Sequence, residues 1–282
     1  MSVSQHPIAL RLERRVGGAT KLLATVMMLP LVDGIFPALV LAGALTYPFG
    51  ILETGLLIFG GSATVAVVLA EMEGTPRERV RAIALVGGLL LPAAAVEAAL
   101  APTVQSLVDM GVFQRFAGLV ILTVAAKTAS ARVGEYLPRP AVIIGLGLVA
   151  SLQPAGASVT FVAEPGLVVR GVAAAATGVG FAMLVAALGP QLQESVDLDR
   201  FRFGSAVALG MLALSVLGVM PTEAPVALGV LCVTAVFSFD PSGGDTESAP
   251  AASASNDDTE DDADEDGRSP FPVEEESRAP WL

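Results

Sequence analysis

Asp33 is the residue whose type and position most strongly suggest chemistry inside an apolar stretch. It lies 12 residues after Lys21, about 18 Å of helix at ~1.5 Å per residue, and so near mid-membrane. A charge there costs about 2.5–3.5 kcal/mol on insertion scales. The nearby Pro30, Gly34 and Pro37 interrupt a helix and free backbone carbonyls. Two interpretations stay open: a carboxylate that binds a substrate or ion, or a buried structural carboxylate paired with a basic group or the backbone.

A second polar residue, Gln153, is followed directly by Pro154 in another apolar stretch. Helix breaks at matching positions of two halves indicate the binding site of a transporter. We therefore predict that Gln153 is the pseudo-symmetric partner of Asp33. Glu53 and Arg170 each lie about a turn inside the outer ends of two further apolar stretches, at corresponding places in the two halves. Their opposite charges are able to form an ion pair across the repeat interface, with a role that is more often structural than functional, and both are kept as candidate binding residues.

Two more charged residues lie near the ends of apolar stretches. Glu97 and Lys127 are expected to extend toward the nearer membrane surface, and Glu97 is kept as a candidate binding residue. The chain has one histidine, His6, and one cysteine, Cys232. These exclude a His-Glu-x-x-His zinc protease, a Cys-rich zinc site and a Ser-His or Cys-His nucleophile pair within a span. We expect no catalytic residue, no cofactor and no metal.

The composition indicates a membrane protein. Of the 282 residues 53% are hydrophobic and 16% charged, and the mean hydropathy is +0.68, which is too apolar for a soluble domain. Apolar stretches of about 20 residues can cross a ~30 Å hydrocarbon core as helices. The sequence holds eight such stretches, at residues 21–45, 50–71, 82–101, 113–131, 140–163, 166–188, 203–220 and 221–239. We predict an all-α bundle of eight transmembrane helices over residues 21–239.

The connecting segments predict an orientation. Every second connection is basic, while the connections between them hold no Lys or Arg, which is the positive-inside pattern. It places both termini in the cytoplasm and the protein in the plasma membrane. Residues 1–20 are expected to be an amphipathic arm on the membrane surface or a plain lead-in. Residues 240–282 hold 14 of the 28 acidic residues and 2 of the 16 basic ones, hence the whole net charge of −12, and predict a disordered acidic tail.

Short matches about 120 residues apart suggest an internal repeat. Residues 15–18 (RVGG) resemble 132–135 (RVGE), and residues 79–81 (RVR) resemble 200–202 (RFR). They predict two tandem four-helix units, residues 15–131 and 132–239, which are parallel because each unit holds an even number of spans. Small residues in the second and sixth stretches are expected to allow close helix packing more than to line a substrate path. They include Gly55, Gly60, Gly171 and Gly178.

The segments HPIALRLER (residues 6–14), VGGATKLLAT (residues 16–25) and PLVDGIFP (residues 30–37) resemble a haloarchaeal family of multi-pass membrane proteins of unknown function. The similarity covers most of the membrane region and not the tail. The acidic tail and the preference for Arg over Lys are also typical of proteins adapted to high salt. The resemblance implies a haloarchaeal plasma-membrane protein and no catalytic residues.

The leading functional prediction is a secondary transporter or permease for a small solute or ion, with the lipid bilayer as its surroundings. The alternative is a membrane anchor or scaffold that binds a cytoplasmic protein through its acidic tail. An intramembrane enzyme with Asp33 or Glu97 as acid or base is least favoured, because no nucleophile or metal cluster accompanies them. The basic residues, 14 Arg and 2 Lys, are too scattered for a nucleic-acid surface.

Overall fold

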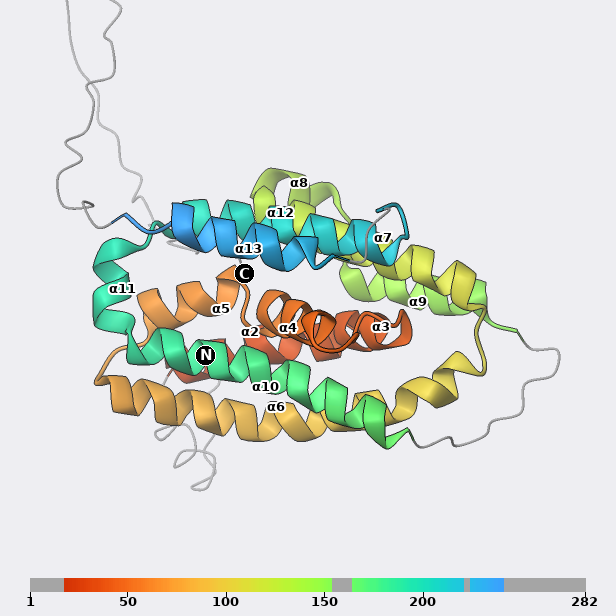
Figure 1. Cartoon of the computed structure of the whole chain (residues 1–282), viewed down its shortest axis with the longest axis horizontal. Helices are drawn as coiled ribbons and strands as arrows, with labels where there is room; N and C mark the ends of the chain where they lie inside the picture. The colour runs from red at the N-terminus through yellow and green to blue at the C-terminus, as the bar shows by residue number, and fades with distance from the viewer. Residues whose placement is uncertain (1–17, 154–163, 221–223, 241–282) are drawn as a thin grey trace, which may run out of the picture. The chain divides into compact units, whose positions relative to one another are not determined.

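The structure is a computed structural model that describes residues 18–153, 164–220 and 224–240. Among these residues 82% are helical and none lies in a strand, so the predicted all-α class is confirmed. Residues 1–17 of the predicted arm, the Pro154 region and the tail beyond residue 240 lie outside the described residues. The helices (Figure 1) are α2 (Gly18–Val32), α3 (Ile35–Leu41), α4 (Phe49–Thr54), α5 (Ser62–Ala66), α6 (Pro76–Gln105), α7 (Met110–Ala129), α8 (Ala131–Tyr136), α9 (Pro140–Ser151), α10 (Pro165–Ala187), α11 (Gly189–Ser195), α12 (Leu198–Val216) and α13 (Val226–Phe237), with π-helical turns η1 (Gly55–Phe59) and η2 (Val67–Glu71).

Several of these helices are long and apolar enough to cross a membrane. They are α2 with α3, α6, α7 and α10, and the bent segment from α4 to η2 is a fifth if it forms one span. α9 and α13 are apolar but have 12 residues each, about 18 Å of helix, which is less than the hydrocarbon core. α12 begins with charged residues, among them Asp199 and Arg200. These lengths fit a membrane protein with four or five spans among the described residues, and the eight predicted spans are not confirmed.

The longest helix, α6, has clear start signals in its sequence. Pro76 occupies its first turn, where a missing N–H costs nothing. Thr75 and Glu78 form a capping box: the backbone N–H of Thr75 donates to Glu78 Oε2 at 2.8 Å, and the N–H of Glu78 donates to Thr75 Oγ1 at 3.4 Å.

α6 packs antiparallel along α10 (Figure 1). A methyl group on Gly87 of α6 would lie 2.7 Å from Val179, and one on Gly171 of α10 would lie 2.7 Å from Ala98. Small residues therefore bring the two backbones together. The prediction that such residues serve close packing is confirmed here.

α7 packs antiparallel along α12 in the same manner. Gly118 of α7 faces Leu217 just after α12. Toward the other end of the pair, Arg202 Nε donates to the carbonyl of Thr128 at 2.8 Å. The start of α7 and the start of α12 therefore lie at opposite ends of this helix pair.

Each of these two helices also carries a shorter antiparallel neighbour, α9 beside α7 and α13 beside α12. The pairs are closed at their ends by the same backbone arrangement. Val108, before α7, forms an antiparallel bridge to Leu152 after α9, and Val196, before α12, forms one to Phe239 after α13. α6–α7–α9 and α10–α12–α13 are thus two units with equivalent contacts.

The two bent segments at the start of the chain are equivalent in the same sense. Gln105 at the end of α6 donates its side-chain amide to the carbonyl of Leu41, the last residue of α3, at 3.3 Å. Gln193, 88 residues later, donates its side-chain amide to the carbonyl of Leu69 in η2. α2–α3 therefore joins the first unit as α4–η2 joins the second.

The sequence carries this correspondence, although the predicted repeat did not use it. Residues 97–109 (EAALAPTVQSLVD) and 185–197 (VAALGPQLQESVD) are identical at seven of 13 positions, 88 residues apart. The predicted tandem units, 15–131 and 132–239, are not confirmed, since the observed equivalence pairs different helices. The short matches behind that prediction fell in Ala-, Gly- and Val-rich sequence, where such coincidences are common.

Candidate binding site at the paired helix breaks

The first break separates α2 from α3. α2 ends at Val32 and α3 begins at Ile35, and Gly34 between them has φ +75°, which glycine adopts without steric cost. Pro37 has no N–H to donate to the carbonyl of Asp33, four residues earlier. Asp33 therefore lies in an interrupted helix, as predicted.

The second break lies between η1 and α5, where the chain bends by 51°. Thr64 Oγ1 donates across the bend to the carbonyl of Phe59 at 2.8 Å. A methyl group on Gly60 would lie 2.8 Å from the ring of Phe181 in α10, so the bend packs tightly. The adjacent Gly60 and Gly61 are the signal for this break in the sequence. From the sequence, the small residues of this stretch are expected to serve packing more than a substrate path, and no break is predicted here.

The two breaks meet inside the bundle. The rings of Phe36 in α3 and Phe59 in η1 have centroids 5.2 Å apart and are tilted by 56°. A small cavity of about 50 Å³ lies beside both breaks and against α7 and α12, and its lining is entirely apolar. The lining residues are Pro30, Ile35, Leu57, Ile58, Ile121, Val124 and Leu209.

Asp33 stands beside this crossing with a partly exposed side chain. Lys127 in α7 and Arg139 just before α9 are near enough to act on its carboxylate through space, but neither forms a salt bridge with it among the described residues. Its neighbour Gly34 faces Ile144 of α9, where an added methyl group would lie at 3.4 Å. The α2–α3 break therefore lies beside the α7–α9 pair. Its surroundings combine one acid with two bases, which suits an ionic or zwitterionic ligand better than an apolar one.

Gln153 is not brought to Asp33. Its side-chain amide donates to Asp109 Oδ2 at 3.3 Å, and its backbone N–H donates to the carbonyl of Leu107 at 3.0 Å. Asp109 caps the start of α7, whereas Lys127, which attracts Asp33, lies near the end of the same helix. The predicted pairing of Asp33 with Gln153 is wrong, because the equivalent of the first break is the second break and not α9.

The predicted ion pair of Glu53 and Arg170 is not formed. Glu53 is 9% exposed, and its Oε1 accepts the backbone N–H of Leu228 in the first turn of α13 at 2.9 Å. Arg170 donates to two carbonyls, from Nη1 to Leu45 at 3.4 Å and from Nε to Gly166 at 3.3 Å. Glu53 therefore caps α13, and Arg170 joins α10 to the loop after α3.

Glu97 faces into the bundle instead of extending to the membrane surface. α6 buries Ala94 and Ala101, three residues before and four residues after Glu97, on the same face of the helix. Glu97 Oε2 is buried and has no hydrogen-bond partner in the part of the chain that the structure describes. An unsatisfied buried acceptor is costly, so Glu97 stays a candidate to bind a ligand or a cation.

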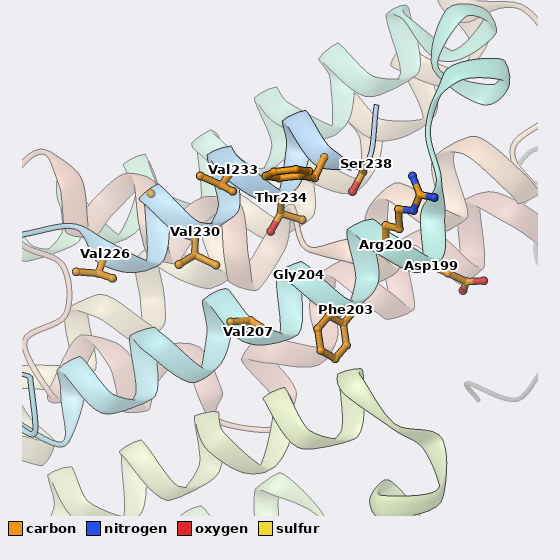
Figure 2. A pocket seen from close by; sticks show the side chains of 12 residues that line it. Asp199, Arg200, Phe203, Gly204, Val207, Val226, Val230, Val233, Thr234 and Ser238 are labelled. Carbon is orange, nitrogen blue, oxygen red and sulfur yellow. The ribbon is translucent and has the colours of Figure 1, made fainter. Parts of the chain in front are cut away.

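An open groove of about 920 Å³ lies elsewhere, between α12 and α13 (Figure 2). Valine and phenylalanine side chains such as Phe203, Val230 and Val233 line most of it, and Asp199 and Arg200 lie at one end. It offers almost no donors or acceptors to a polar solute. Such a lining does not suit recognition of a polar ligand.

Within the described residues, no group of three or more His, Cys, Asp or Glu side chains is placed to hold a metal ion. Residues 90–217 match the model of a family of unknown function (DUF5794). This match covers about half of α6 and all of α7 to α12, but neither α13 nor the broken segments before α6. No curated protein and no solved structure matches the chain.

Proposed function

We propose that this protein is a secondary carrier, transporter- or permease-like, for a small solute or ion. The observation that carries the proposal is the meeting of two broken segments, α2–α3 and α4–η2, that make equivalent contacts with two equivalent three-helix units. Transporters commonly place broken helices of two related repeats around one central site. The proposal assigns no catalytic residue.

The proposed membrane arrangement has eight segments and follows the distribution of basic residues. Both termini lie in the cytoplasm, α6 runs outward and α10 runs inward, so the two units have opposite orientations in the membrane. α9 and α13 enter from opposite sides as short segments. This arrangement is an inverted repeat and replaces the parallel repeat that the sequence predicted. It suits the antiparallel packing of α6 on α10 and of α7 on α12.

Asp33 is the proposed binding residue, with Lys127 and Arg139 facing the same ligand. Irregular backbone at membrane depth is tolerated where it faces protein or a watery cavity, and Asp33 lies at such a point. Glu97 is proposed as a second site for a cation or a proton from the opposite side of α2–α3. The acidic tail fits an organism that lives at high salt.

The test is solute flux in proteoliposomes that contain the purified protein. A panel of inorganic ions, amino acids, sugars and carboxylates is screened by solid-supported membrane electrophysiology and tracer uptake. At least one should give a saturable signal that Asp33→Asn lowers tenfold or more, with unchanged yield and elution volume. Glu135→Gln, at an exposed position in α8, is the matched control and should keep the signal. An active Asp33→Asn protein would overturn the role of Asp33.

A further inference from the structure

The two equivalent units are each closed at one end by a clasp with the same backbone bonds. At the first clasp the N–H of Asp109 donates to the carbonyl of Ser151 at 2.7 Å. At the second the N–H of Asp197 donates to the carbonyl of Ser238 at 2.9 Å, and the N–H of Asp240 returns to the carbonyl of Ser195 at 2.7 Å. In the first clasp the returning bond is the one from Gln153 to Leu107.

One aspartate side chain serves two purposes in each clasp. Asp109 Oδ1 accepts the N–H of Val112 at 3.0 Å and so caps α7, while its Oδ2 accepts from Gln153. Asp197 Oδ1 caps α12 in the same way, through the N–H groups of Asp199 and Arg200, both at 3.0 Å. Its Oδ2 pairs with Arg200 Nε at 3.0 Å, and Arg200 Nη1 lies 3.9 Å from Asp240 Oδ2.

Both clasps stand at the same distance along their helices from the central cavity. Ile121 lines the cavity 12 residues after Asp109, and Leu209 lines it 12 residues after Asp197. Twelve residues are about 18 Å of helix. Because α7 and α12 are antiparallel, the cavity lies between the two clasps, with one at either end. The backbone bonds of both clasps are formed in the structure.

We propose that the Asp109 clasp and the Asp197 clasp are two equivalent gates that open alternately, each giving water access to the cavity from its own side. The inference rests on the proposed carrier function. Separation of α9 from α7 opens the outer side, and separation of α13 from α12 opens the cytoplasmic side. Two equivalent units with opposite orientations make the two openings mechanically alike, which is the general basis of alternating access in repeat-built carriers.

The experiment measures access to the cavity without any solute. Ile121→Cys in a Cys232→Ser background gives one reporter thiol at the cavity wall, and a membrane-impermeant maleimide is applied to either face of the membrane. The clasps are weakened by Asp109→Asn and Asp197→Asn. Asparagine keeps the helix-capping oxygen but removes the second carboxylate oxygen. Asp199→Asn, beside the second clasp but with no side-chain role in it, is the control.

We expect Asp109→Asn to raise the labelling rate at least fivefold from outside only, and Asp197→Asn to raise it from the cytoplasmic side only. Cysteines at Val108 and Leu152 should lock the first clasp. These residues form a non-hydrogen-bonded antiparallel pair, whose Cα separation of about 4.5 Å suits a disulfide. The lock, formed before the reporter is labelled, should abolish labelling from outside and spare labelling from the cytoplasm.

The gate assignment would be overturned if Asp109→Asn and Asp197→Asn raised labelling equally from both sides. It would also be overturned if neither the variants nor the disulfide lock changed the labelling rate. Because the labelling readout needs no substrate, the gate proposal and the carrier proposal can be refuted independently of each other. Side-specific labelling without flux of any tested solute would leave the gates standing and remove the carrier function. Solute flux that persists with the first clasp locked would remove the gates alone.

Discussion

The centroids of the Phe36 and Phe59 rings lie 5.2 Å apart. This contact joins the break between α2 and α3 to the break between η1 and α5. Both side chains are fully buried. The contact fixes the crossing of α2–α3 with α4–η2, on which the proposed site depends. An aromatic pair of this geometry adds about 0.5–1.5 kcal/mol beyond the area that it buries.

Replacing one of these rings should loosen the crossing. Phe59→Ala should lower the free energy of unfolding by about 3 kcal/mol, because the large-to-small change leaves a void that the packed helices cannot fill. The measurement is the midpoint of thermal unfolding followed by fluorescence-detected size exclusion. Phe237→Ala is the control, since Phe237 is 73% exposed. Equal midpoints for the two variants would show that the crossing does not depend on the ring pair.

Close packing beside the second break predicts a contrast between two glycines of α10. A methyl group on Gly178 would clash with Phe59 and with the carbonyl of Gly55, whereas one on Gly180 would meet nothing within 4 Å. Gly178→Ala should therefore cost about 1–3 kcal/mol through overpacking, and Gly180→Ala should be neutral or slightly stabilising. Unfolding in a graded mixture of detergents measures both. A stable Gly178→Ala protein would contradict the close approach.

The cap that Glu53 places on α13 gives a third prediction. Glu53→Ala leaves the N–H of Leu228 without this acceptor at a buried position, and should cost about 1–3 kcal/mol. Glu53→Gln keeps an acceptor oxygen and should lose less. The measurement is hydrogen exchange of the first turn of α13, which should speed up in Glu53→Ala and remain slower in Glu53→Gln. Exchange that is equally fast in both variants would mean that the negative charge is what matters.

The two clasps should respond differently to salt. The Asp197 clasp includes ion pairs with Arg200, whose side chain is 60% exposed, and exposed pairs weaken as the Debye length falls from about 10 Å at 0.1 M to about 3 Å at 1 M. The Asp109 clasp uses the neutral amide of Gln153. Raising the salt concentration should therefore increase cytoplasmic labelling of the Ile121→Cys reporter and leave outer labelling unchanged. An increase in outer labelling with unchanged cytoplasmic labelling would contradict the assignment of the two clasps.

The helices could be predicted well from the sequence where the apolar pattern is local. The expected stretches 82–101, 113–131 and 166–188 lie on α6, α7 and α10 with ends shifted by a few residues. Asp33 could also be placed in a broken helix, because Pro30, Gly34 and Pro37 act on their own neighbours. Such features need only propensity and spacing.

The tertiary partners could not be predicted in the same way. Glu53 contacts Leu228, 175 residues away, and nothing in the local sequence of either residue indicates the other. The expected repeat was wrong for a related reason, since three- and four-residue matches do not separate homology from chance. The longer match between residues 97–109 and 185–197 was visible in the sequence, and it leads to the clasps and to Gln105 and Gln193.

The proposed carrier function depends most on the two equivalent units having opposite orientations in the membrane. Single cysteines at Gly111, beside the first clasp, and at Glu194, beside the second, can each be introduced with Cys232→Ser; both positions are exposed. An impermeant maleimide is then applied to intact cells before and after permeabilisation. We expect the cysteine at Gly111 to be labelled in intact cells and the one at Glu194 to be labelled only after permeabilisation. Labelling of both positions from the same side would contradict these opposite orientations.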